Sequence, residues 1–129
     1  FTDGNTNELE IDTQAAPQTA TSTATLTTTQ VLGGLLVVDP TTTASSLTMP
    51  TATAIDAVMT NMKTNSTFKL TVINLGTSTG LITVVVGTGI TAVGNLVVAI
   101  TGSAAGVSGA AEFLFRKTGD AAYTVYRVA

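Results

Sequence analysis

The sequence contains no cysteine and no histidine, and each absence removes a class of chemistry. Without cysteine the chain can form no disulfide framework, no thiolate metal site and no thiol nucleophile. Without histidine it lacks the usual acid–base group at neutral pH, so nucleophilic catalysis would need a Ser–Lys arrangement. We therefore expect no enzyme activity, and we assign no catalytic, cofactor-binding or metal-binding residues.

Charged side chains are also scarce, at 10% of the residues, and the net charge is −3. The five lysines and arginines form no basic patch of the kind that neutralises phosphates, so we expect no direct nucleic-acid binding. The longest apolar run, Val31 to Val38, is far shorter than the roughly 18 residues of a membrane span. We therefore expect no membrane contact either.

Threonine is abundant instead, and it occupies 28 of the 129 positions. Threonine and valine are β-branched and suit the pleated surface of a sheet. Because aromatic residues are few, the core must be built from small and medium aliphatic side chains that each bury little area. The length indicates one domain, and a thinly packed β domain of this kind gains stability by associating with copies of itself.

Residues 1–18 are polar and acidic, and we interpret them as an extended N-terminal arm that precedes a single domain at residues 19–129. In that domain, short apolar runs separated by turn residues predict an all-β sandwich or barrel without a clear internal repeat. The predicted strands are Thr21–Thr29, Val31–Val38, Leu47–Met49, Thr67–Asn74, Leu81–Val86, Ile90–Val93 and Leu96–Thr101, followed by a loop at Gly102–Gly109 and a hairpin of Glu112–Lys117 with Tyr123–Val128.

One short helix is predicted in the middle of the chain. Its apolar positions follow the spacing i, i+3, i+4 and i+7, at Ile55, Val58, Met59 and Met62. Thr53 resembles a helix start, because an acidic residue follows three positions later. The segment has only two to three turns, so packing must hold it in place.

The stretch LITVVVGTGITA at residues 81–92 contains G-x-G-x-x-A, which is the fingerprint of a dinucleotide-binding turn. Such a site needs a helix directly after the glycines, because the phosphates bind at the N-terminus of that helix. The residues that follow, ITAVGNLVVAITG, are rich in β-branched side chains and have no amphipathic helical face. We predict a bend between two strands, in which Gly87 and Gly89 supply backbone freedom.

The acidic arm invites comparison with a calcium-binding loop. Asp3, Asn5 and Asn7 match the first, third and fifth positions of an EF-type loop. The sixth and twelfth positions should be Gly and Glu, but the arm has Glu8 and Gln14 there. We expect an arm that is solvated or bound to a partner, and no metal site.

The C-terminal hairpin is predicted to gather three cations, Arg116, Lys117 and Arg127. They are either ordinary surface charges that pair with Glu112 and Asp120, or a contact patch for an acidic neighbour such as the arm of another copy. The carboxylates formally available for paired-carboxylate chemistry are Asp39, Asp56, Glu112 and Asp120. All four fall at predicted turns, helix ends or strand ends, where acidic residues are ordinary.

Four runs, SLTMPTATAIDAVM, STFKLTVIN, GTGITAVG and FRKTGDAAYTVYRV, resemble a class of small structural proteins of tailed phages of marine and other aquatic bacteria. The shared layout is a Thr/Ala stretch, a strand into Leu-x-x-Pro-Thr, a short helix, a Phe-bearing strand ending in Asn, a Gly-x-Gly bend and a hairpin ending in Tyr-Arg. These features fall at Leu47–Thr51, Ile55–Met62, Phe68–Asn74, Gly87–Gly94 and Phe113–Arg127. The resemblance covers about residues 20–128 and brings no catalytic residues.

This resemblance implies a virion structural protein on the capsid exterior, which decorates or cements a capsid or forms a head fibre. It implies a jelly-roll-type β-sandwich, assembly as a homotrimer, and contact with the major capsid protein or a neighbouring virion protein. Two alternatives stay open. One is a glycan- or surface-recognition β-sandwich module, against which the lack of tryptophan counts. The other is a scaffold domain of a longer fibre protein.

Overall fold

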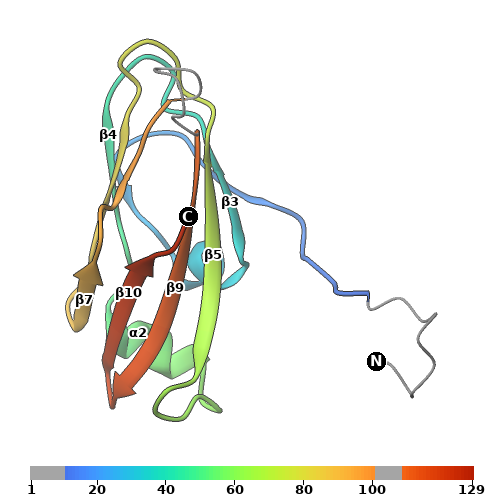
Figure 1. Ribbon diagram of the computed structural model, residues 1–129, viewed down its shortest axis with the longest axis vertical. Helices are drawn as coiled ribbons and strands as arrows, with labels where there is room; N and C mark the ends of the chain where they lie inside the picture. The colour runs from blue at the N-terminus through green and yellow to red at the C-terminus, as the bar shows by residue number, and fades with distance from the viewer. Residues whose placement is uncertain (1–10, 101–108) are drawn as a thin grey trace.

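The computed structural model describes residues 11–100 and 109–129, which form ten strands and two short helices (Figure 1). The strands are β1 (Gln18–Ala20), β2 (Ala24–Thr25), β3 (Leu35–Val38), β4 (Ser45–Thr48), β5 (Thr67–Asn74), β6 (Ile82–Val85), β7 (Ile90–Val93), β8 (Val97–Val98), β9 (Ala110–Gly119) and β10 (Ala122–Arg127). The helices are α1 (Thr28–Leu32) and α2 (Ala52–Val58), and neither of these described helices is long and apolar enough to cross a membrane.

The strands form two sheets, so the expected β-rich fold is confirmed. The six-stranded sheet has the order β1-β3-β5-β9-β10-β7, and the four-stranded sheet has the order β2-β4-β6-β8. Five of the eight strand pairs are parallel and three are antiparallel. A jelly roll is built from antiparallel strands, so this mixed pairing does not confirm that finer assignment.

The first six strands follow a repeated winding in which the chain alternates between the two sheets. Each pass adds one strand to each sheet, parallel to the strand from the previous pass, and the helices connect the passes. Leu36 pairs with Val72, 36 residues further on, and Ser45 pairs with Ile82, 37 residues further on. We predict no clear internal repeat from the sequence, and that prediction misses this repeat of topology. Parallel pairing requires strands at corresponding positions of successive windings, but their residues need not be similar.

Several strands lie where their local patterns predict them. β5 has the predicted bounds, and the alternation along it buries Leu70 and Val72 while Phe68 packs against the core. β7 also has the predicted bounds, and the C-terminal hairpin is present as the antiparallel pair of β9 and β10. The loop predicted at Gly102–Gly109 lies almost entirely outside the described residues.

One hydrophobic core joins the two sheets. Most of its residues are aliphatic, as the composition predicts, and they come from strands of both sheets and from the two helices. Its largest fully buried side chains, however, are Tyr123, Phe113 and Phe115 of the C-terminal hairpin. Phe68 stacks on Phe115 with the ring centroids 4.6 Å apart and the planes at 7°. The few aromatic residues are thus concentrated in the middle of the six-stranded sheet.

The prediction of a strand over Thr21–Thr29 and of one helix in the chain is wrong. Helix α1 occupies the end of that segment, and only β2 within it is a strand. The reason is a capping box: the Thr27 hydroxyl accepts from the Gln30 amide at 3.2 Å, and the Gln30 side chain accepts from the Thr27 amide at 2.8 Å. Gly34, with φ +85°, ends the helix in the left-handed region. Local capping therefore overrides the β preference of threonine.

The predicted central helix exists, but it begins and ends earlier than its apolar spacing indicates. Thr51, not Thr53, is the N-cap, and its hydroxyl accepts from the Ala54 amide at 3.1 Å. The helix stops at Val58, which is therefore 56% exposed instead of facing the core, while Ile55 is fully buried. The two turns of α2 thus bring Ala52 and Ile55 into the core.

Asn74, at the end of β5, is a buried polar residue that connects the two sheets. Its amide nitrogen donates to the carbonyl of Gly80 at 2.9 Å and to that of Val98 in β8 at 3.1 Å. Its side-chain oxygen accepts from the amide of Gly76 at 2.7 Å. Three hydrogen bonds therefore hold the turn after β5 and the last strand of the second sheet to the first sheet.

Replacing Asn74 with alanine should lower the free energy of unfolding by about 2 to 4 kcal/mol, because buried backbone groups lose their partners. Urea denaturation measures the change. The control is Asn61→Ala, at an exposed position, which should shift stability by less than about 0.5 kcal/mol. Equal effects of the two substitutions would contradict the assigned role of Asn74.

Candidate functional site

A cluster of three ionisable side chains lies where α2 meets the C-terminal hairpin. Asp56 of α2 accepts hydrogen bonds on one carboxylate oxygen from Lys117 of β9 at 2.7 Å and from the Tyr123 hydroxyl of β10 at 2.5 Å. Its other oxygen accepts from the backbone amide of Ala121 at 2.7 Å. Three donors thus converge on one carboxylate.

The surroundings of the cluster favour a charged carboxylate and a neutral phenol. Lys117 and Tyr123 are buried, with 8% and 1% of their surfaces exposed. The hydrogen bond from Lys117, followed by those from Tyr123 and Ala121, lowers the pKa of Asp56 to about 2. Burial, followed by the hydrogen bond to Asp56, raises the pKa of Tyr123 above its ordinary value of 10.0. At neutral pH the cluster is an ion pair with a neutral tyrosine.

This arrangement is suited to holding the fold together and unsuited to proton transfer. A general acid or base works best with a pKa near the working pH and with access to a reacting atom. Asp56 stays ionised far below neutral pH, and its oxygens are already engaged by Lys117, Tyr123 and Ala121. The cluster therefore joins α2 to the turn between β9 and β10.

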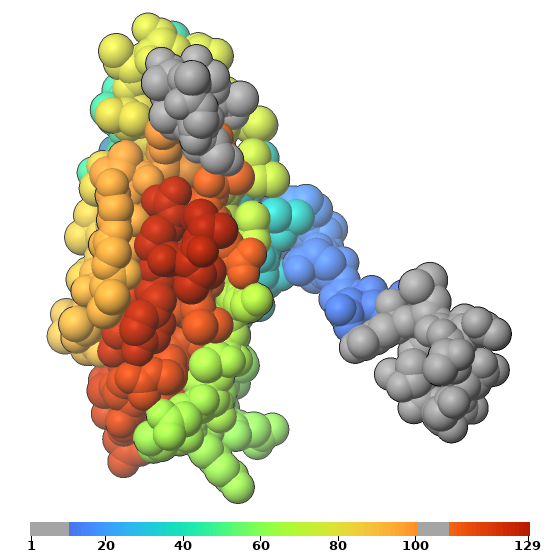
Figure 2. All heavy atoms as spheres, viewed as in Figure 1, coloured from blue at the N-terminus to red at the C-terminus, as the bar shows by residue number. Residues whose placement is uncertain are grey.

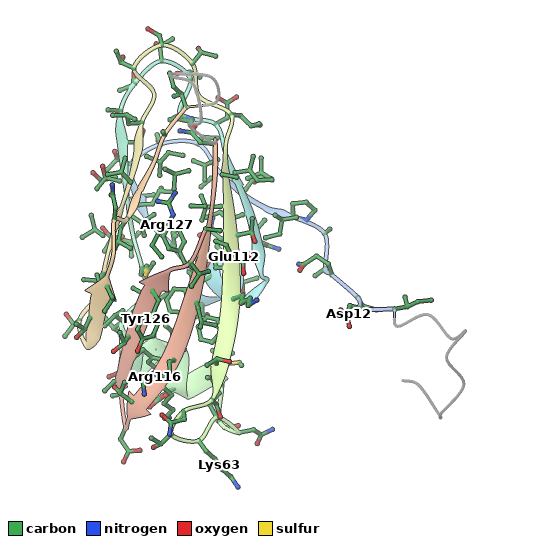
Figure 3. All side chains as sticks on the ribbon, viewed as in Figure 1. Asp12, Lys63, Glu112, Arg116, Tyr126 and Arg127 are labelled. Carbon is green, nitrogen blue, oxygen red and sulfur yellow. The ribbon has the colours of Figure 1, made fainter. Side chains whose placement is uncertain are left out.

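The prediction that Arg116, Lys117 and Arg127 form one cationic group is wrong, and Figure 3 shows Arg116 and Arg127 apart from each other. Successive residues of a strand face opposite sides of the sheet, so Lys117 points into the core and Arg116 points out. The Arg116 guanidinium donates to the Tyr126 hydroxyl at 2.9 Å and to the Asn65 side chain at 2.9 Å. Arg116 is a surface residue, and Lys117 is part of the buried cluster.

Arg127 lies apart from both of these cations. Its guanidinium donates to the backbone carbonyls of Asn95 at 3.1 Å and Val97 at 2.8 Å, and it sits 5.8 Å from the ring centroid of Phe113. Glu112 pairs with Lys69 at 3.2 Å and not with an arginine. The Arg127 Nε also donates to the oxygen of Ala129 at 2.5 Å. Within the described parts of the chain, no aspartate or glutamate side chain lies within ion-pair distance of Arg116 or Arg127.

The other candidate carboxylates do not come together with Asp56. The Asp39 carboxylate accepts from the amide of Thr41 at 3.0 Å, and Glu112 faces Lys69 on the outside of the six-stranded sheet. No group of three acidic residues in residues 11–100 and 109–129 is placed to hold a metal ion. Of the residues considered for a calcium loop, Asp3, Asn5, Asn7 and Glu8 lie outside the described residues.

The chain does hold one S-x-x-K spacing, at Ser66 and Lys69, of the kind that Ser–Lys catalysis would need. The Ser66 hydroxyl accepts from the backbone amide of Lys63 at 3.0 Å. The Lys69 side chain is 67% exposed and is paired with Glu112. The two side chains have separate partners, so this spacing does not form a nucleophile–base pair.

The Gly-x-Gly motif is a bend, as predicted. Gly89 has φ +87°, and a Cβ there would lie 2.7 Å from the Cβ of Ala52 and 2.7 Å from the carbonyl oxygen of Ala121. Strand β7 follows it directly, where a dinucleotide site would require a helix. Gly89 is therefore needed both for its backbone conformation and for the close approach of α2 and the hairpin.

The arm begins the described chain as an exposed segment that leads away from the body (Figure 2). All residues from 11 to 17 are exposed. One contact ties them down: the Gln14 side chain donates to the carbonyl of Gly33 at 2.5 Å. A shallow groove of about 370 Å³ lies beside this contact, between the arm, α1 and the end of α2, and is lined by Ala15, Gln18, Thr28, Thr29, Leu32, Gly33 and Val58.

Comparison with known proteins adds no functional assignment to this geometry. No protein-family model, no curated protein and no solved structure matches the chain. The function therefore has to be argued from the buried cluster, the surface and the arm.

Replacing Asp56 with alanine should lower the free energy of unfolding by about 3 to 5 kcal/mol, because it leaves the Lys117 ammonium buried without a counter-charge. The double variant Asp56→Ala/Lys117→Met should recover part of this loss, since the uncompensated charge is then gone. Thermal and urea unfolding measure both changes. The control is Asp120→Ala on the exposed turn nearby, and a loss as large as that of Asp56→Ala there would contradict the proposal.

The same carboxylate should make stability depend on acid pH. Its pKa is about 2 in the folded protein against 3.8 ordinarily, so its contribution to stability is present above pH 4 and is lost as the pH falls toward 2. Urea unfolding at pH 6, 4, 3 and 2 measures the profile. The Asp56→Ala variant should lack this part of the decline, and parallel profiles of the two proteins would show that Asp56 is not its source.

Proposed function

We propose that this chain is a structural protein of a virion, which decorates or cements the capsid of a tailed phage without catalysing a reaction. In this role it assembles as a homotrimer on the capsid exterior and contacts the major capsid protein or a neighbouring virion protein. The proposal rests on the resemblance in sequence layout, and the arrangement of the described residues supports it.

The observation that carries the proposal is the exposed arm on a firmly joined β body. Residues 11–17 leave the body with one side-chain anchor, at Gln14, and expose the apolar side chain of Ile11 to 76%. An extended segment that has few contacts with its own body is free to bind a neighbouring molecule. A cementing protein needs both parts, a stable body and a segment that reaches a neighbour.

The use of the buried polar groups also supports a structural role. Asp56, Lys117 and Tyr123 hold the helix to the hairpin, and Asn74 holds the second sheet to the first. Among the described residues, the buried side chains of Asn74 and Lys117 thus connect separate elements of the fold, and the buried Ser45 hydroxyl makes a local hydrogen bond to the carbonyl of Thr43. This is what a protein that must withstand assembly into a shell requires.

The jelly-roll form of the sandwich remains a prediction, since only three of the eight strand pairs are antiparallel.

The alternative of a glycan-binding module needs exposed aromatic side chains for stacking on sugars. Among the described aromatic residues, Tyr126 is on the outer face, where the Arg116 guanidinium lies 5.8 Å from its ring centroid. A glycan array with specific hits would favour that alternative.

Sedimentation of native source material, with mass spectrometry of each fraction, tests the proposed role. The chain should travel with nucleic-acid-filled particles of megadalton mass, in tens to hundreds of copies per particle. If it stays in the light fractions as a free protein, the capsid role is wrong.

Removing residues 1–13 should weaken binding to particles while leaving the body folded, because Gln14 and β1 remain in place. We expect the unfolding free energy to change by less than about 0.5 kcal/mol, since the part of this segment that the structure describes is exposed. Occupancy on particles stripped of the protein, measured by co-sedimentation, should fall. Thr83→Ala on the exposed side of β6 is the control, and unchanged occupancy of the truncated chain would sink the proposed role of the arm.

A further inference from the structure

Strand β7 is an edge strand with one open side. It pairs with β10 through the register Tyr123 to Ile90, with the Tyr123 amide 3.0 Å from the Gly89 carbonyl. In a parallel ladder this register directs the N–H and C=O of Thr91 toward β10 and those of Ala92 away from it. No backbone hydrogen bond within the described ranges engages Ala92. The outer side of β7 therefore offers a donor and an acceptor for another strand.

This edge lacks the charged side chains and the proline that often prevent strand addition. Its sequence, ITAV, contains no charge and no proline, and Val93 is 50% exposed. The other three edge strands, β1, β2 and β8, have only two or three residues each. Among the described edges, β7 is therefore the longest, and three of its four residues are exposed; it lies at the lower left in Figure 1.

The arm has the pattern of a strand without a partner. Residues 8–12 read E-L-E-I-D, a strict alternation of acidic and apolar side chains that places Leu9 and Ile11 on one face. Residues 11–17 of the arm make no backbone hydrogen bond with the rest of the described chain. An alternating segment of this kind gains a hydrogen-bonded ladder and an apolar contact when it joins a sheet edge.

The arm of one copy is poorly placed to reach its own β7. It enters the body through β1, and β1 and β7 are the opposite edges of the same six-stranded sheet, about 24 Å apart at the usual strand spacing. The arm also leads away from the sheet, on the side opposite β7 (Figures 1 and 2). A second copy can bring its arm to β7 without crossing the body.

Charge complements this placement. Arg127 donates to the carbonyls of Asn95 and Val97, which follow β7 in the chain, so a cation lies at the end of the open edge. Its Nε also donates to the oxygen of Ala129 at 2.5 Å, and the described residues place no aspartate or glutamate side chain within ion-pair distance of it. The acidic face of E-L-E-I-D supplies carboxylates of the opposite sign.

We infer that residues 8–12 of one copy add as a strand to the open edge of β7 in a second copy. Donor and acceptor lie on opposite sides of each molecule, so the contact is head-to-tail. In the homotrimer of the proposed function, three such contacts close a ring. The inference deepens the proposed structural role, and the biological purpose of the interface rests on that role. The interface itself should form between copies of the purified protein, without any capsid present.

Sedimentation equilibrium of the purified protein tests this interface. Ala92→Pro removes the outward N–H without touching the ladder to β10, whereas Ala92→Thr changes the side chain and keeps the N–H. The wild-type chain and Ala92→Thr should sediment as a trimer of the 13.0 kDa chain, and Ala92→Pro and the chain without residues 1–13 should each sediment as a monomer of its own chain mass. Circular dichroism checks that each variant is folded.

A crosslinking experiment keeps the inference testable if Ala92→Pro fails to fold. The chain has no cysteine, so Ile11→Cys carries a maleimide photo-crosslinker at one site. We expect crosslinks from it to residues 90–95 of a different chain, and none there from the same label on Thr83→Cys. A monomeric wild-type chain at 100 µM, an unchanged mass of the truncated chain, or crosslinks elsewhere would overturn the inference.

The two proposals can fail separately. A chain that forms the ring in solution but does not travel with particles would overturn the capsid role and leave the interface intact. A chain that travels with particles and whose arm crosslinks only to other proteins would overturn the interface and leave the capsid role intact.

Discussion

One carboxylate, that of Asp56, fixes the part of the molecule on which the remaining strands depend. It binds Lys117, Tyr123 and the backbone of Ala121, so it holds both strands of the C-terminal hairpin and the turn between them against α2. That hairpin lies inside the six-stranded sheet, with β5 on one side and β7 on the other. A shift of its register would therefore displace strands on both sides, and a one-residue slip would turn every side chain to the opposite face.

Small side chains allow α2 and the C-terminal hairpin to lie against each other. Gly89 and Ala52 allow α2, the bend before β7 and the hairpin turn to approach one another closely. The core that results contains mostly aliphatic side chains and buries little area for each of them, so specific polar contacts complement it. Asp56 binds the turn of the C-terminal hairpin, and Asn74 binds the second sheet to the first. Buried polar groups of this kind stabilise a fold only when their hydrogen bonds are made, and these are.

The sequence predicts the elements whose information is local. The strands Thr67–Asn74 and Ile90–Val93 alternate and are bounded by turn residues, so their patterns suffice. Helix α1 is missed because threonine favours strands and the capping box of Thr27 and Gln30 is a short signal. The winding is missed because parallel pairing joins residues more than thirty positions apart, on which local periodicity carries no information.

Only part of the cluster of Asp56, Lys117 and Tyr123 could be predicted from the sequence. The inward direction of Lys117 could be predicted, because it continues the alternation of Phe113 and Phe115 along β9. Its partner could not, since Asp56 is 61 residues away in the sequence and shows locally only as an acidic residue near a helix start. The exposed arm is recognisable from composition, whereas the open side of β7 becomes visible only when the strand order of the whole sheet is known.

The position of the largest core residues along the chain has a consequence for how the protein is made. Phe113, Phe115 and Tyr123 are among the last seventeen residues, and β5 finds its antiparallel partner only in β9. While the ribosome is still producing this protein, the windings that precede β9 have neither their neighbour in the sheet nor the aromatic half of their core. The six-stranded sheet and its core can therefore close only after the hairpin of β9 and β10 has been synthesised.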